Sequence, residues 1–120
     1  MSAGGGEPGP GVAFRSNAEI AVHVPELAPA AAFYVGVLGF RLVARSDDHL
    51  ELDTGALRLY VNRDAAAIPC FVPSLDVPDA AAAKRRLEAA GCKIVREDAQ
   101  SGGFYFRDPL GLVVDVVQRP

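Results

Sequence analysis

Apolar and polar residues alternate along several short stretches of this chain, the period-two pattern typical of strands covered on one side. Between residues 18 and 24 every second residue is apolar, which predicts a strand that ends at Pro25. The same pattern predicts three more strands in the first half of the chain, at 41–45, 49–53 and 57–62.

A helix is expected between the first two of these strands. An alanine-rich run with Phe33 and Val37 on one side has helical spacing, and Pro29 suits the first turn, where its missing N–H is not needed. Gly39 follows as a left-handed stop.

The second half of the chain repeats this order. It contains a strand at 71–77, a helix that Asp79 can cap, and Gly91 as the stop, 52 positions after Gly39. Apolar positions three and four apart predict a helix face that packs on a sheet: Ala80, Ala83, Leu87 and Ala90. Strands follow at 93–96, 103–107 and 112–118, with a turn at 108–111.

The repeated order β-α-β-β-β predicts an α+β fold made of two modules, at about 18–63 and 68–118. One helix covers only one face of each small sheet. We therefore expect the modules to curve towards each other as a concave half-barrel, whose inner face can hold a ligand.

Composition narrows the class of protein. A chain of 120 residues suits one domain, here expected over 17–120, and the net charge of −3 argues against nucleic-acid binding. No apolar stretch approaches the roughly 20 residues that span a bilayer, so no membrane partner is expected. Residues 1–16 read as a flexible Gly/Pro-rich tail without a secretory signal, which favours a cytoplasmic protein. Cys70 and Cys92 show no metal or redox spacing and are expected in or near the core.

Short motifs resemble a known superfamily. The opening Val24-Pro25-Glu26-Leu27, then Phe33-Tyr34 and Val37-Leu38-Gly39-Phe40, is similar to the opening signature of the vicinal-oxygen-chelate superfamily. The ending Phe106-Arg107-Asp108-Pro109, with Gly111 and the acidic Asp115, is similar to its closing signature. The resemblance spans about residues 18–118 and implies the fold of glyoxalases, extradiol dioxygenases and bleomycin-resistance proteins.

The resemblance also implies where a metal would bind. The metalloenzymes of the superfamily carry His or Glu ligands on four strands, and the corresponding positions here are Glu19, Arg58, Val72 and Asp115. Arginine has no lone pair to donate and repels a divalent cation, and valine offers no donor. The chain therefore resembles the metal-free bleomycin-resistance members most, and we expect no metal, no cofactor and no catalytic residue.

A ligand site is expected in place of the metal. Arg58 can bridge the carboxylates of Glu19 and Asp115, either to grip a polar group of a ligand or as a structural ion-pair network. Alternation along the strands adds further candidates on the same face: His23, Tyr60, Tyr105, Val113 and Val117. Such a cleft suits an aromatic or heteroaromatic molecule with a cationic or amide group.

Three functions remain open at this point. The first is a small-molecule binding protein, for an antibiotic or an aromatic metabolite, which by resemblance acts as a homodimer that can form by domain swapping. The second is a metal-dependent enzyme of the same fold that uses displaced ligands such as Glu19, Asp115 and His23. The third is a structural or regulatory module whose cleft is filled by its own side chains.

Overall fold

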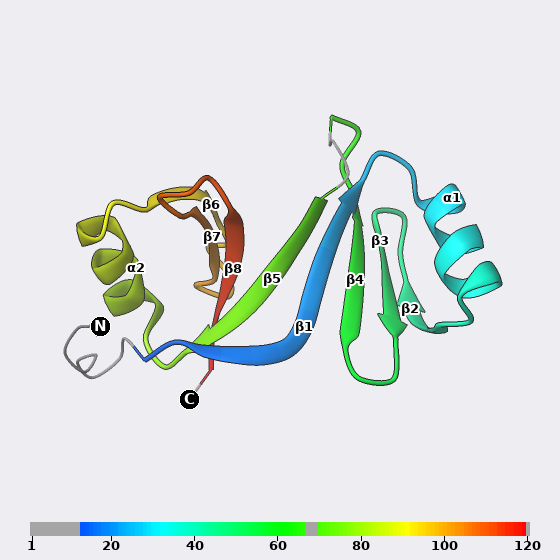
Figure 1. Cartoon of the computed structure of the whole chain (residues 1–120), viewed down its shortest axis with the longest axis horizontal. Coiled ribbons are helices and arrows are strands. Elements are labelled where there is room, and N and C mark those ends of the chain that lie inside the picture. Colours follow the sequence, from blue (N-terminus) through cyan, green and yellow to red (C-terminus); the bar gives the residue numbers. More distant parts are fainter. Residues whose placement is uncertain (1–12, 67–69, 120) are drawn as a thin grey trace. The chain divides into compact units, whose positions relative to one another are not determined.

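The computed structural model describes residues 13–66 and 70–119 (Figure 1). Its elements in chain order are β1 (Arg15–Val24), α1 (Leu27–Ala31), the π-helical η2 (Ala32–Val37), β2 (Arg41–Arg45), β3 (His49–Asp53), β4 (Arg58–Arg63), β5 (Cys70–Val77), α2 (Ala80–Ala89), β6 (Lys93–Glu97), β7 (Phe104–Arg107) and β8 (Val113–Gln118). The expectation of an α+β chain that repeats β-α-β-β-β is confirmed. Most of the expected tail lies outside the described residues, and β1 begins at Arg15, so residues 15 and 16 belong to a strand.

Contacts divide the chain into two compact units, and each is described by itself. The first unit comprises Ala18–Ser74, and the second comprises Leu75 onwards together with the residues up to Asn17. In the first unit β2, β3 and β4 pair antiparallel, and β1 lies parallel to β4. In the second unit β6, β7 and β8 pair antiparallel in that order.

The core of the first unit lies between its sheet and its helix. Alternate residues of β1, β3 and β4 are buried there: Val22, Leu50, Leu52, Leu59 and Val61. Leu27 of α1 and Tyr34 of η2 pack against this cluster, and the ring of Tyr34 stacks on Phe40 with centroids 6.3 Å apart. Because successive side chains of a strand point to opposite faces, the residues between these core positions lie on the other side, the helix-free face.

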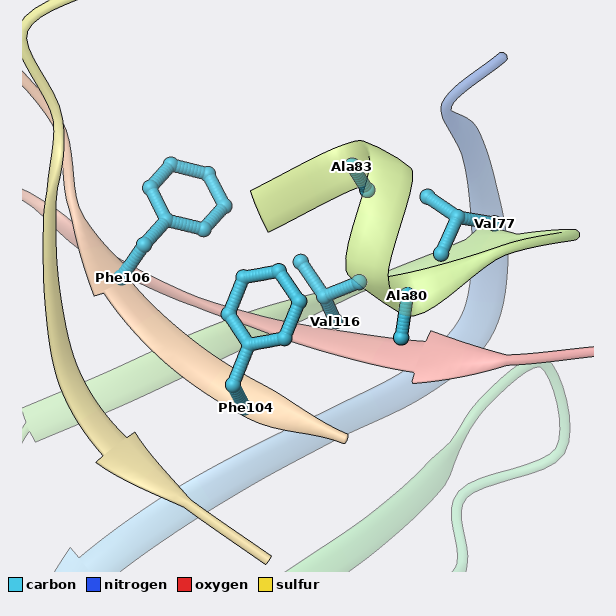
Figure 2. Close-up of a cluster of buried hydrophobic side chains, with 6 residues drawn as sticks. All are labelled: Val77, Ala80, Ala83, Phe104, Phe106 and Val116. Carbon is cyan, nitrogen blue, oxygen red and sulfur yellow. The ribbon is translucent and has the colours of Figure 1, made fainter. Parts of the chain in front are cut away.

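The core of the second unit is built in the same way (Figure 2). Phe104 and Phe106 of β7 and Val116 of β8 pack against Ala80 and Ala83 of α2. The two alanines are almost completely buried, and their small side chains let the helix lie close to the sheet. Phe106 therefore faces the helix, and Tyr105, next to it in the strand, lies on the opposite face.

The predicted helix ends are also confirmed. The carboxylate of Asp79 accepts a hydrogen bond from the N–H of Ala82 at 3.2 Å, which caps α2. Gly39 and Gly91 have φ of 78° and 92°, the left-handed conformation expected of glycines that end helices.

Three features differ from the sequence expectation or go beyond it. The second half of the first helix is a π-helix, whose wider turn brings the N–H of Leu38 to the carbonyl of Phe33 at 2.9 Å. Pairing shifts by one residue at Val43 in β2 and at Val95 in β6, a β-bulge at the matching place in each unit. Cys92 packs against the second core as expected, whereas Cys70 is exposed.

Among the helices at 13–66 and 70–119, none has the length and apolar character that a bilayer crossing requires.

Candidate functional site

The helix-free face of the first unit carries a row of charged residues across four strands. Neighbouring strands place four of these residues side by side. Arg58 of β4 lies opposite Glu19 of β1 on one side and Asp53 of β3 on the other, and Asp53 in turn lies opposite Arg41 of β2. A pocket of about 420 Å³ opens beside this row, lined by Ala18, Glu19, Asp53, Gly55, Ala56, Leu57, Arg58 and Tyr60. Three predicted site residues, Glu19, Arg58 and Tyr60, therefore share one pocket.

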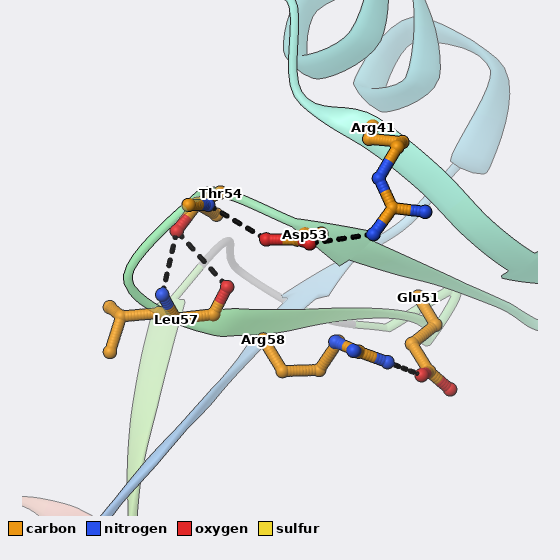
Figure 3. Close-up of polar contacts among 7 residues, drawn as sticks. Arg41, Glu51, Asp53, Thr54, Leu57 and Arg58 are labelled. Atoms are coloured by element: carbon orange, nitrogen blue, oxygen red, sulfur yellow. Dashed lines mark hydrogen bonds and ion pairs between the residues drawn. The ribbon is translucent and has the colours of Figure 1, made fainter.

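Three charged residues of this row, Arg41, Asp53 and Arg58, are paired within the unit (Figure 3). Arg41 donates to Asp53 at 2.7 Å, and the N–H of Gly55 donates to the other oxygen of Asp53 at 2.8 Å. The hydrogen bond from Gly55, followed by the one from Arg41, lowers the pKa of Asp53 below its ordinary value. Arg58 pairs with Glu51, which differs from the expected bridge between Glu19 and Asp115.

Sequence reasoning missed Glu51 although a signal for it existed. Glu51 lies between the buried Leu50 and Leu52, so alternation alone places it on the helix-free face. Its register opposite Tyr60 depends on how the β3–β4 hairpin closes at Thr54.

His23 and Tyr60 lie further along the same face. His23 is 7% exposed and lies in register with Asn62 of β4. Tyr60 is half-buried, between Ala21 of β1 and Glu51 of β3 in register. Because Val22, Leu59 and Val61 belong to the core, both side chains lie on the side of the sheet away from α1.

The remaining predicted residues lie in the second unit. Tyr105 of β7 is in register with Asp115 of β8, so both lie on the helix-free face of that sheet. A pocket of about 310 Å³ opens there, lined by Arg96, Asp98, Ser101, Gly103, Phe104, Tyr105, Asp115, Val116 and Val117. Val113 lies two residues before Asp115, in register with Arg107, and does not line this pocket.

Arg96 is a second residue that sequence reasoning missed. Its guanidinium carbon lies 5.5 Å from the centroid of the Tyr105 ring, within the range of a cation–π contact. In a regular strand Arg96 would share the face of Ile94, which packs on the core; the bulge at Val95 turns it to the other face.

The two hairpins also show which positions correspond between the units. Asp53–Arg58 and Arg107–Val113 are the pairs next to the turn, and Glu51–Tyr60 and Tyr105–Asp115 are the next pairs inward. Tyr60, rather than Arg58, is therefore the counterpart of Asp115. Neither Arg58 nor Tyr60 brings the carboxylate that the family's metalloenzymes place on the fourth strand.

The residues at the family's metal positions do not fit a divalent ion. Glu19 and Asp115 are the only oxygen acids among them, while Arg58 carries a positive charge held by Glu51 and Val72 is apolar. Over the described part of the chain no group of three or more His, Cys, Asp or Glu residues is gathered to hold a metal.

A family model for the Glyoxalase/Bleomycin resistance protein/Dioxygenase superfamily matches residues 18–116 of this chain. No curated protein sequence matches it significantly.

Solved structures with the same fold include extradiol dioxygenases. A variant of homoprotocatechuate 2,3-dioxygenase from Brevibacterium fuscum matches with a TM-score of 0.71 at 20% identity, over 92% of this chain and 34% of that one. The anaerobic complex of that enzyme with 3,4-dihydroxyphenylacetate gives a TM-score of 0.70 at 20% identity, over 92% of this chain and 38% of that one. The chain thus spans little more than a third of these enzymes, and the likeness concerns the fold.

Proposed function

This chain belongs to the Glyoxalase/Bleomycin resistance protein/Dioxygenase superfamily, and we propose that it is a small-molecule binding protein that does not use the metal site of that superfamily. Its ligand is expected to be an aromatic metabolite or an antibiotic. The residues proposed for binding lie on the helix-free face of each unit taken by itself. They are Glu19, His23, Arg58 and Tyr60 in the first unit, and Tyr105, Val113 and Asp115 in the second.

The observation that carries the proposal is the identity of the side chains at the family's metal positions. Arg58 is paired with Glu51, and Tyr60, the counterpart of Asp115 by hairpin register, holds a phenol. A fixed guanidinium charge beside Glu19 opposes a divalent cation and favours hydrogen bonding to a ligand. Aromatic side chains with polar ends, Tyr60 and Tyr105, line pockets of the size that small molecules occupy.

A metal-dependent enzyme with displaced ligands is the second candidate, favoured by the dioxygenases among the similar structures. Its ligands would be Glu19, Asp115 and the buried His23. This candidate predicts a bound metal and an activity that chelation abolishes.

One experiment separates the two candidates. Purified protein is dialysed against nickel, zinc and manganese in turn, freed of excess metal, and analysed for metal content by plasma mass spectrometry. A parallel thermal-shift screen uses aromatic metabolites and aromatic antibiotics, because a ligand of the native state raises the melting temperature. The proposal expects metal content far below one ion per chain and stabilisation by at least one compound, without turnover. Near-stoichiometric metal with chelator-sensitive activity would replace it with the enzyme.

The homodimer stays a prediction from the resemblance. Sedimentation velocity over a range of protein concentrations tests it, and a single species with the mass of one chain would contradict it.

A further inference from the structure

We propose that Arg96 is the anion-binding residue of the pocket in the second unit, and that this pocket takes a small aromatic molecule with a single carboxylate. The inference rests on the proposed binding function and specifies its ligand. It also changes the expected charge of that ligand, because the sequence alone pointed to a cationic or amide group.

The position of Arg96 depends on the bulge at Val95. Ile94 pairs with Phe106, and Arg96 pairs with Tyr105, so one extra residue lies between them on β6. In regular pairing without the bulge, Val95 would lie opposite Tyr105, and Arg96 would lie opposite Phe104 on the core side. The first unit has the same bulge at Val43, but there the residue turned to the helix-free face is Ala44. The matching positions thus hold a methyl group in one unit and a guanidinium in the other.

The contact with Tyr105 orients the guanidinium and leaves its donors available. A cation–π contact with the ring provides no lone-pair acceptor to the guanidinium, so its N–H groups can still bind a carboxylate in bidentate fashion. Within 13–66 and 70–119 no ion pair is formed by Arg96. The acids near it in sequence are engaged elsewhere, since Glu97 pairs with Lys84 and Asp98 accepts from Ser101 at 2.8 Å and from the N–H of Gln100 at 3.0 Å.

The rest of the pocket limits the ligand. Tyr105 separates Arg96 from Asp115 in the row across β6, β7 and β8, so the backbones of the two charged residues lie about 10 Å apart at ordinary strand spacing. An anion at Arg96 is therefore held away from Asp115, but a second negative charge reaching across the ring would be repelled. Val117 and the ring of Tyr105 offer apolar surface to the body of the molecule.

The test is an NMR titration of ¹⁵N-labelled full-length protein with benzoate, benzamide and benzylamine, which share a phenyl ring and differ in charge. Benzoate is expected to shift the amide signals of Arg96 and Tyr105 and to bind more tightly than the other two. Arg96→Ala should weaken benzoate binding about 10- to 100-fold, as expected for losing a hydrogen-bonded charge, and remove the preference over benzamide.

Two further variants serve as controls. Arg45→Ala removes the same charge from the exposed edge strand of the first unit and should leave benzoate affinity unchanged. Arg96→Lys keeps the charge without the planar fork and should restore only part of the affinity. Both Arg96 variants should keep the amide spectrum of the folded protein, because Arg96 is exposed.

The outcomes distinguish the Arg96 inference from the wider binding function. Equal benzoate affinity in wild type and Arg96→Ala overturns the role of Arg96. Binding of benzamide or benzylamine in this pocket without benzoate overturns it too, and leaves the binding function standing. If none of the three binds, the Arg96 inference fails, and the binding function fails only if the wider compound screen is also negative.

Discussion

Asp53 joins two parts of the first unit, because one carboxylate oxygen accepts from the turn at Gly55 and the other from Arg41 on β2. These contacts lower the pKa of Asp53 in the folded protein below the ordinary value of 3.8. The ionised carboxylate of Asp53 therefore contributes fully to stability above pH 3.8. This contribution is lost as the pH falls through the lower pKa that Asp53 has in the folded protein.

Asp53→Asn should reduce this acid dependence, because asparagine can still accept from Gly55 but carries no charge for Arg41. Urea unfolding at about pH 6 and about pH 3 measures it, and the variant should lose less stability than wild type between the two. Asp47→Asn, at an exposed position on the loop before β3, is the control and should behave as wild type. An equal pH dependence in all three proteins would contradict the assignment.

At the scale of elements, the start of α2 is stabilised by the hydrogen bond that its cap residue, Asp79, accepts. The Asp79 side chain satisfies the N–H of Ala82, which has no partner within the helix. Asp79→Ala should lower the free energy of unfolding by about 1 kcal/mol, within a range of about 0.5–2. Asp79→Asn retains an acceptor and should cost much less. Similar losses for the two variants in urea denaturation would mean that the cap is not the cause.

Helices and strands were the features that the sequence predicted best. Alternation and helical spacing placed every strand and both helices, because these patterns follow directly from which face of an element is buried. The bulges at Val43 and Val95 escaped this reasoning, since a single extra residue leaves no signal in the hydrophobic pattern.

The same limit explains what was missed in the candidate site. Arg96 was overlooked because regular alternation puts it on the core side, and Glu51 because its partner is set by the register between strands. Alternation within each strand was enough to predict the face on which four candidate side chains lie, and the observed cores occupy the opposite face. These candidates are Glu19, His23, Tyr60 and Tyr105. The partner of a charged residue depends on the register between strands, so the observed ion pair of Arg58 with Glu51 could not be derived from one strand at a time.

At the scale of the whole molecule, two separate clusters of buried side chains support the fold. They share no residue, and each joins one helix to one sheet. Phe104 is the largest fully buried side chain of the second cluster, with 2% of its surface exposed. Its packing should therefore dominate the stability of that unit.

Phe104→Ala is expected to cost about 3–5 kcal/mol in the free energy of unfolding, from lost burial and the cavity that remains. Phe71→Ala makes the same change at a side chain that is 64% exposed and should cost far less. Chemical denaturation of both variants measures the difference. Comparable losses would show that burial at Phe104 is not what stabilises the chain.

The two bulged strands have a further consequence for behaviour at high concentration. Among the described residues β2 pairs with β3 alone and β6 with β7 alone, so each has one row of backbone N–H and C=O groups that no described strand pairs. Such edges are templates for aggregation, which natural sheets resist by bulges and by charged side chains, lysine above all. Both devices are present here: each strand is interrupted at its central valine and carries basic residues on either side, Arg41 and Arg45 in β2, Lys93 and Arg96 in β6. We therefore expect the irregularity that turns Arg96 towards Tyr105 also to oppose pairing between the edge strands of neighbouring molecules.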